Sequence, residues 1–185
     1  AGKLTNAHKE LDTGLSAWNL AMGSQELYDW LDAEPQLFHP GDLDYIHSVE
    51  RISKLSNVIS INGGVQLDLM GQENAESTGT RQIRDTGGQM DFLEGAYRSK
   101  GGKGFICINS SRVTKDGERK SNILATIPGG STISAPRTMI QYVATEYGIA
   151  SLSGKTLRER AEAMAAIAHP DFREELMKYA RENFK

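Results

Sequence analysis

The chain has 185 residues, of which 38% are hydrophobic, and this size and composition suit one globular domain with its own core. Its net charge is −3 without any block of like charges, so a protein that binds the phosphate backbone of nucleic acids is not indicated. No stretch approaches the ~20 apolar residues of a membrane span, and the single cysteine, Cys107, excludes a disulfide framework.

The N-terminal residues and the single cysteine indicate the cellular setting. Residues 1–6 contain neither an initiator Met nor the apolar core of a signal peptide, so we expect a cut or processed N-terminus and a reduced, cytoplasmic setting. Cys107 lies in the apolar run Phe105 to Ile108, which predicts a buried strand thiol. A nucleophilic cysteine would need a base and an electropositive, exposed setting.

Helices are expected first, near the N-terminus. Ser24 can cap a helix over 24–31, in which Leu27, Trp30 and Leu31 share one face. Pro35 and the residues around Gly41 end this pattern. A second short helix is expected to begin at Ser48.

Strands dominate the middle of the chain. The expected strands are, in order, residues 58–61, 65–69, 105–108, 121–127 and 141–145. Residues 71–86 are polar and predict a loop, 91–96 predict a short helix, and 111–120 predict a charged hairpin around Asp116-Gly117.

The C-terminal tail is expected to be helical. Thr156 and Glu159 form a capping box, and Leu157, Ala161, Met164 and Ala165 make the apolar face of the helix that follows. Pro170 suits the first position of a last helix lined by Phe172, Leu176 and Tyr179. Helices first, strands in the middle and helices last predict an α/β architecture around one sheet.

The step Gly87-Gly88 is the first candidate for chemistry. Glycines let backbone N–H groups approach a ligand, and at a helix start these groups favour negative charge, as in an oxyanion or a phosphate. The alternative is a plain tight turn. The sequence contains no Walker A motif, no Gly-x-Gly-x-x-Gly and no Gly-x-Ser-x-Gly elbow.

Histidines and carboxylates give weaker candidates. His8, His39, His47 and His169 are not spaced as metal ligands; His169 is expected to cap a helix, and His47 to lie at a loop edge. Glu146 ends an apolar strand, where α/β sheets place ligand sites, although a buried structural carboxylate is equally compatible. Glu174 and Glu175 are expected on a solvated helix face. The residues alone therefore indicate an α/β domain with a candidate anion-binding glycine step.

A set of short motifs in fixed order extends this reading. The chain resembles the acetyl-CoA hydrolase/transferase family, which includes the 4-hydroxybutyrate and butyrate:acetate CoA-transferases. The motifs that carry the resemblance are Ile61-Asn62, Gln66 to Glu76, Gly87 to Phe92, Ala135 to Arg137, Thr145 to Ala150, Arg158 to Ala161 and Ile167 to Arg173. They span nearly the whole chain.

The resemblance implies a CoA-transferase-like fold of the NagB/RpiA type, with a mostly parallel mixed sheet flanked by helices. Residues 1–185 would form the C-terminal domain of a two-domain enzyme. It further implies a ping-pong reaction in which a glutamate forms an acyl anhydride and then a glutamyl-CoA thioester. That glutamate should lie upstream of Ala1, in a part that also carries a Gly-x-Gly CoA-binding loop. The chain by itself is therefore predicted to be inactive.

The resemblance also assigns residues to the site. The backbone N–H of Gly88 would face the thioester oxygen and CoA, and Gly87 and Gly64 would contact CoA. His47 stands where some relatives have an asparagine that polarises the carbonyl; imidazole can also donate one hydrogen bond. No metal and no permanently bound cofactor are expected, with CoA and acyl-CoA as substrates. The implied partners are acyl-CoA, a small carboxylate, the N-terminal domain and a second copy of the chain, with no nucleic acid or membrane.

Two alternatives stay open. An acyl-CoA hydrolase would use the same site with water as the acceptor. A non-catalytic CoA-binding module would act by association and would have an unrelated upstream segment. The acyl group and the acceptor acid are not readable from the sequence.

Overall fold

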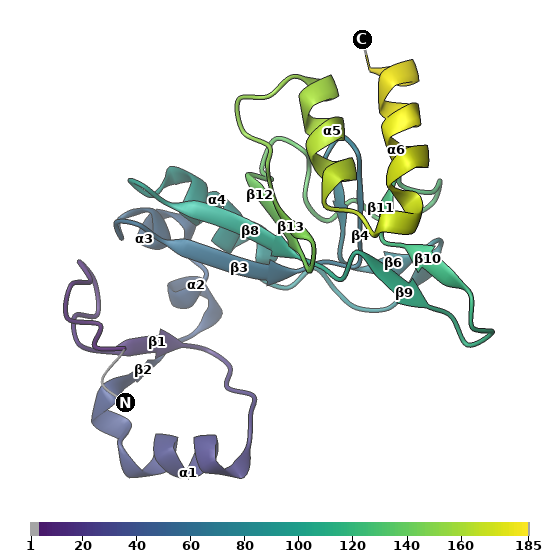
Figure 1. Ribbon diagram of the computed structural model, residues 1–185. Helices are drawn as coiled ribbons and strands as arrows, with labels where there is room; N and C mark the ends of the chain where they lie inside the picture. The colour runs from purple at the N-terminus through teal and green to yellow at the C-terminus, as the bar shows by residue number, and fades with distance from the viewer. Residues whose placement is uncertain (1–3, 185) are drawn as a thin grey trace.

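The computed structural model describes residues 4–184, in which a mixed sheet packs against helices (Figure 1). The helices are α1 (Gln25–Ala33), α2 (Leu43–Ile46), α3 (Val49–Ser53), α4 (Gln89–Arg98), α5 (Leu157–Ala166) and α6 (Pro170–Asn183), with a 3-10 turn η1 at Pro35–Leu37. The strands are β1 (Ser16–Trp18), β2 (Phe38–Pro40), β3 (Ile59–Gly63), β4 (Gln66–Asp68), β5 (Glu73–Asn74), β6 (Ser77–Thr78), β7 (Arg81–Gln82), β8 (Lys103–Cys107), β9 (Ser111–Val113), β10 (Arg119–Ser121), β11 (Ile123–Leu124), β12 (Tyr142–Thr145) and β13 (Gly148–Ser151).

The main sheet has the strand order β13-β12-β8-β3. Strands β3, β8 and β12 run parallel, and β13 joins β12 as an antiparallel edge. The expected mostly parallel mixed sheet is confirmed. Parallel strands end at the same edge of a sheet. The segments that follow β3 and β8, which contain Gly64 and Ser110, therefore leave the sheet at one edge.

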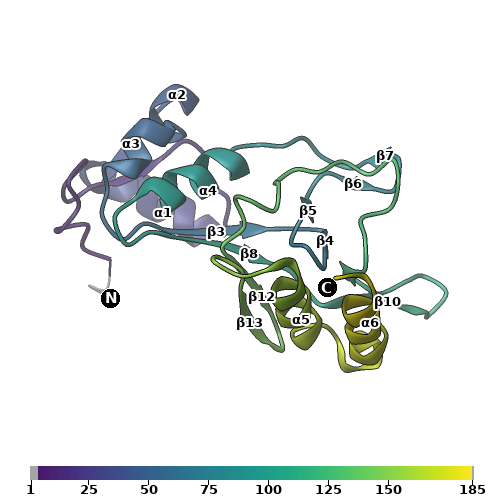
Figure 2. The ribbon, with the colours of Figure 1, turned by 90° about the horizontal axis from the view of Figure 1, so that it is seen from above.

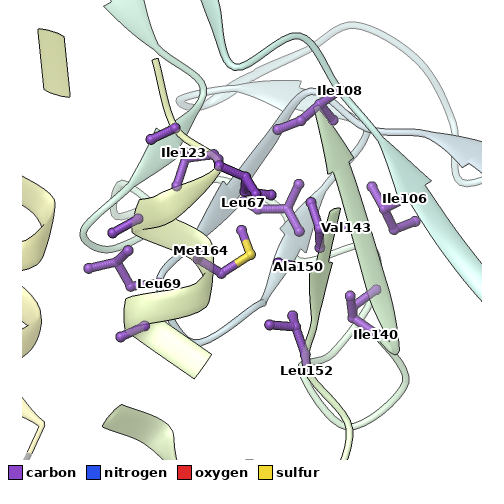
Figure 3. Close-up of a cluster of buried hydrophobic side chains, with 14 of the residues drawn as sticks. Leu67, Leu69, Ile106, Ile108, Ile123, Ile140, Val143, Ala150, Leu152 and Met164 are labelled. Carbon is purple, nitrogen blue, oxygen red and sulfur yellow. The ribbon is translucent and has the colours of Figure 1, made fainter. Parts of the chain in front are cut away.

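One face of this sheet carries the hydrophobic core. Ile106, Val143 and Ala150 point into it from adjacent strands, and Met164 of α5 covers them (Figure 3). Leu93 of α4 belongs to the same cluster. Helix α4 packs on β3 and β8, and α5 packs on β13 and α6 (Figure 2). Leu67 of β4 and Ile123 of β11 extend the core, since these two strands pair in parallel beside the main sheet.

The opposite face of the main sheet is open among residues 4–184. Ile61, Phe105 and Tyr142 lie in register across three strands on this face, and Ile61 is 70% exposed. Cys107, in register with Gly63, is exposed as well. The expectation of a buried thiol is therefore wrong: alternate residues of β8 point to opposite faces, and Cys107 is on the uncovered one.

The segment 71–86, expected as a polar loop, is partly buried. Glu73, Asn74, Ala75, Glu76 and Ser77 are all buried, and the segment contains β5, β6 and β7. Two of its backbone N–H groups are satisfied locally, because the Asn74 side chain accepts hydrogen bonds from the backbone of Glu76 and Ser77. Polar composition predicted a loop, but backbone capping of this kind allows part of the segment to be buried.

The helical tail follows the sequence prediction closely. Thr156 and Glu159 form the capping box of α5, and Pro170 opens α6 after His169, whose side chain caps it. Ala161, Met164 and Ala165 are buried, but Leu157 is 40% exposed and does not belong to the apolar face. Within residues 4–184, no helix has the length and apolar content to cross a membrane.

The N-terminal unit is attached more loosely. Figure 1 shows α1, β1 and β2 apart from the main sheet, linked to it through α2 and α3. Strands β1 and β2 pair in parallel, and α1 has no buried residue. Asp12 fastens the unit by an ion pair with Arg51 and by hydrogen bonds with His39 and Tyr45.

Candidate functional site

The Gly87-Gly88 step forms the start of α4. Gly87 has φ of +58°, a left-handed conformation that a residue with a Cβ rarely adopts, and Gly88 is the N-cap residue of the helix. The carbonyl of Gly88 accepts from the N–H of Phe92 at 3.2 Å. The first N–H groups of a helix have no partner within the helix, so this end of α4 offers donors to a ligand.

His47 lies directly against Gly88. It caps the C-terminal end of α2, and a Cβ built on Gly88 would be 2.1 Å from the His47 Cε1 atom. Only glycine therefore fits at position 88 with the ring in this place. The structure thus brings together two residues that are 41 positions apart in the printed sequence.

The surroundings of His47 favour one tautomer. The Asn19 amide nitrogen is 3.2 Å from Nε2 of His47, and Nε2 accepts this hydrogen bond in the tautomer that carries its proton on Nδ1. In that tautomer the Nδ1 proton faces a carboxylate oxygen of Asp91, at 3.6 Å from Nδ1. The Phe92 ring packs edge-on at 5.1 Å. Asn19, Asp91 and Phe92 together hold the imidazole in one orientation.

An open cavity of about 470 Å³ contains these groups. It is lined by Leu43, Asp44, His47, Ser48, Gly87, Gly88 and Asp91. The carboxylates of Asp44 and Asp91 disfavour the binding of a charged anion in this cavity. A neutral carbonyl group could accept hydrogen bonds from the helix start or from a reoriented imidazole. The chemistry that this arrangement favours is therefore carbonyl polarisation.

Gly64 is not among the residues that line this cavity. It follows β3, and its N–H donates to the carbonyl of Cys107 at 3.3 Å. A Cβ at this position would be 2.8 Å from Oε1 of Glu73 and 3.0 Å from methyl carbons of Ile106 and Ile108. Glycine at position 64 is required by the packing of these three neighbours. The predicted contact of Gly64 with CoA stays a prediction.

Glu73, which lies beside Gly64 and outside this cavity, is a buried carboxyl group that the sequence analysis did not single out. Its side chain is fully buried, and desolvation raises its pKa to about 7, although Gln89 and Arg84 act in the opposite direction. The only signal in the sequence was a carboxylate inside a polar segment that predicted a loop.

The other candidates lie elsewhere. Glu146 accepts hydrogen bonds from the backbone and hydroxyl of Ser110 at 2.9 and 2.6 Å. Desolvation acts to raise its pKa, but these bonds prevail and lower it. His39 pairs with Asp12, and His169 caps α6. Among residues 4–184, no three His, Cys, Asp or Glu side chains gather as metal ligands would.

Comparisons with known proteins give one family and its transferases. The acetyl-CoA hydrolase/transferase C-terminal domain family matches residues 23–180. Butyryl-CoA:acetate CoA-transferase of Anaerostipes caccae is 43% identical over 180 residues, which cover 97% of this chain and 40% of the relative. 4-Hydroxybutyrate coenzyme A transferase of Clostridium kluyveri is 42% identical and covers 100% of this chain and 42% of its own length.

The fold leads to the same group of proteins. The crystal structure of RipA from Yersinia pestis superimposes with a TM-score of 0.86 at 38% identity, covering 97% of this chain and 39% of RipA. Acetyl-CoA hydrolases are more distant; that of Eremothecium gossypii is 30% identical over 135 residues, which cover 72% of this chain and 24% of the hydrolase. The chain spans about two fifths of the length of the transferases that it matches.

Proposed function

Because this chain belongs to the acetyl-CoA hydrolase/transferase C-terminal domain family, we propose that it is the C-terminal part of an acyl-CoA:carboxylate CoA-transferase. The expected acyl groups are those of its relatives: butyrate, 4-hydroxybutyrate and acetate. Coenzyme A and its thioesters enter as substrates, not as a resident cofactor. A cytoplasmic location and a homodimeric assembly stay predictions from the sequence.

The proposed chemistry is divided between this chain and the rest of the enzyme. The nucleophilic glutamate, which forms the acyl anhydride and then the glutamyl-CoA thioester, is assigned to the part that precedes Ala1. This chain contributes the N–H of Gly88 and the imidazole of His47, which polarise the carbonyl that is attacked. Gly87 and Gly64 are the further residues proposed to contact CoA.

The observation that carries the proposal is the contact of His47 with Gly88 at the start of α4. The helix start offers N–H donors to the cavity, and the His47 imidazole can add one more if it turns away from Asp91, while Asp44 and Asp91 disfavour free anions there. Removing one such donor from an acyl-transfer site usually lowers kcat by about 10²–10³.

Gly88→Ala in the complete enzyme tests this role. The added Cβ would displace the His47 ring, and we expect kcat for transfer from acyl-CoA to acetate to fall about 10²–10³-fold. The matched control is Gly129→Ala, since Gly129 has no heavy atom within 4 Å of an added Cβ. Turnover of the Gly88 variant within a few-fold of the control would reject the assignment.

His47 is tested by comparing two replacements. Asparagine can still donate one hydrogen bond, so His47→Asn should retain much of the activity, whereas His47→Ala should lose more. Equal losses in kcat from the two replacements would reject the hydrogen-bonding role and leave His47 as a packing residue for Phe92.

Borohydride trapping separates the transferase from its alternatives. Incubation of the complete enzyme with acyl-CoA and borohydride should convert one glutamate to an alcohol, and mass spectrometry should place it outside residues 1–185. A reduced glutamate inside this chain would overturn the division of labour proposed above. A complete protein that binds CoA without any mark, or that passes acyl groups to water in preference to acetate, would favour the binding module or the hydrolase, respectively.

A further inference from the structure

Glu73 is held rigidly at the centre of the chain. Its N–H donates to the carbonyl of Ala135 at 3.0 Å, and its own carbonyl accepts from the N–H of Ser134 at 2.8 Å. On its other side it pairs with Leu67 in the antiparallel β4–β5 ladder. Backbone contacts on both sides fix the position from which its side chain projects.

The side chain of Glu73 ends beside the Gly63-Gly64 turn and near the side chain of Gln89, without a hydrogen-bond partner. Both of its carboxylate oxygens are buried and accept no hydrogen bond of normal geometry. Oε1 lies against the backbone of Gly64, where a Cβ would approach it to 2.8 Å. The nitrogen of the Gln89 side chain, which is close enough to influence the charge of Glu73, is also buried and unpartnered.

Gln89 is the residue immediately after Gly88 and the first residue of α4. We propose that Glu73 is a positioning residue, whose buried carboxyl couples the Gly63-Gly64 turn to the Gly87-Gly88 turn through the side chain of Gln89. The inference rests on the proposed function, in which the N–H of Gly88 polarises the substrate carbonyl.

The protonation state of Glu73 decides whether this coupling works. A neutral carboxyl can accept from the Gln89 nitrogen and donate its own proton to the Gln89 oxygen, so a flat acid–amide pair satisfies the orphaned atoms. The charged groups that act on Glu73 are Arg84, which favours ionisation, and Glu76, which opposes it. Arg84 is already engaged with the carbonyls of Gly63 and Ala75, so an ionised Glu73 would lack a dedicated counter-ion.

Burial raises the pKa of Glu73 to about 7, which places the change of state in a range that experiments reach easily. Below that pH the acid–amide pair holds Gln89 and hence the start of α4. Above it, an unpaired charge in an apolar wall forces the carboxylate to move or to admit water, and the Gly87-Gly88 turn loses its support.

The first test uses the 185-residue chain and needs no activity. Backbone amide signals of Gly88 and Gln89 are followed by NMR from pH 5 to 9. Wild type should show a titration step near pH 7 that is missing in Glu73→Gln, an uncharged isostere of the protonated acid. His47, which lies beside Gly88, is intact in both proteins, so only the difference between the curves is assigned to Glu73. The control is Glu162→Gln on the exposed face of α5. Identical curves for wild type and Glu73→Gln would overturn the inference.

The second test uses the complete enzyme. For a single ionisation near pH 7, wild-type kcat should fall about tenfold between pH 6 and pH 8, whereas Glu73→Gln should keep its kcat over that range. Glu73→Leu should be slower at every pH, because Gln89 then has no partner. Loss of the wild-type pH dependence in Glu162→Gln as well would contradict the assignment to Glu73. If the wild-type enzyme transfers no CoA, the proposed function fails, and the NMR comparison alone decides the role of Glu73.

Discussion

Arg160 joins three separate segments of the fold, and its removal gives the sharpest stability prediction. Its Nε, Nη1 and Nη2 atoms donate to the carbonyls of Met70, Leu152 and Arg137, each at 2.8 Å. The residue is 8% exposed. One guanidinium therefore fastens α5 to the β4–β5 turn, to the end of β13 and to the segment before β12. The change considered is Arg160→Leu, which keeps an apolar stem and removes all three donors.

The magnitude follows from opposing contributions. Hydrogen bonds that involve a charged group contribute about 1.5–3 kcal/mol each, so three give an upper value of about 5–9 kcal/mol. Burial, with the charge of Arg137 nearby, lowers the pKa of Arg160, which means that the guanidinium is held at a cost that leucine would not incur. We expect a net loss of about 3–5 kcal/mol in the free energy of unfolding. That corresponds to a fall in Tm on the order of 10 °C.

The assay is urea unfolding followed by circular dichroism. Arg158 is the matched control, because it lies on the same helix but is half exposed and makes one ion pair with Glu162 at 3.0 Å. Arg158→Leu should lose no more than about 0.5 kcal/mol. Arg160→Lys keeps the charge but not the three-pronged geometry, and should fall between the two. If Arg160→Leu were within 1 kcal/mol of Arg158→Leu, roughly the net value of a single hydrogen bond, the bridging role would be wrong.

Three further predictions concern stability and association. Thr156→Ala should lower the free energy of unfolding by about 1 kcal/mol, because the capping box loses its hydroxyl, and Thr156→Ser should restore it; equal losses would exclude a capping effect. Glu73 has a folded-state pKa of about 7 against 4.5 in the unfolded chain, so the folded state binds more protons in that window; the contribution of Glu73 to stability should be largest below pH 4.5 and fall by about 3 kcal/mol as pH rises to 7 and beyond. Urea titrations at several pH values should show this slope, and Glu73→Gln should flatten it; an unchanged slope would refute the assignment. Ile61→Lys, on the open sheet face, should reduce self-association in sedimentation experiments without lowering Tm, whereas Ile106→Lys in the core should prevent folding. Equal effects of the two substitutions on folding would contradict the placement of Ile61 and Ile106 on opposite faces of the sheet.

Local signals in the sequence were reliable where the chain itself determines the structure. The capping box at Thr156, the Pro170 start of α6 and the strand around Ile106 depend on neighbours within a few residues, and each is found in the structure. The short helix α2 was missed, because four residues carry too little periodicity to be recognised.

Predictions that depend on distant neighbours were less successful. The continuous apolar run from Phe105 to Ile108 predicted a buried strand, but it does not say which face of the sheet is covered, so Cys107 was wrongly expected to be buried. Polarity predicted a loop over residues 71–86, whereas Glu73 is buried there and Asn74 satisfies the backbone of Glu76 and Ser77.

In the candidate site, too, local features could be predicted from the sequence and contacts between distant residues could not. The Gly87-Gly88 step is readable as a helix start with exposed donors, but the approach of His47 from 41 residues upstream is a property of the fold. The resemblance to the family suggested both residues before their contact was visible. Glu73 lacked even that signal, because its importance arises from burial between Gly64 and Gln89.

The loosely attached N-terminal unit affects how the folding of this protein is observed. Both tryptophans of the chain, Trp18 and Trp30, belong to this unit, on β1 and α1, whereas the core around Ile106 and Met164 contains none. Intrinsic tryptophan fluorescence therefore follows the release of one small appendage, while circular dichroism follows mainly the sheet and helices α4 to α6. A unit with so little buried surface opens at a lower free energy than the core. The two optical signals should consequently give different midpoints, and the fluorescence midpoint is a measure of attachment, not of global stability.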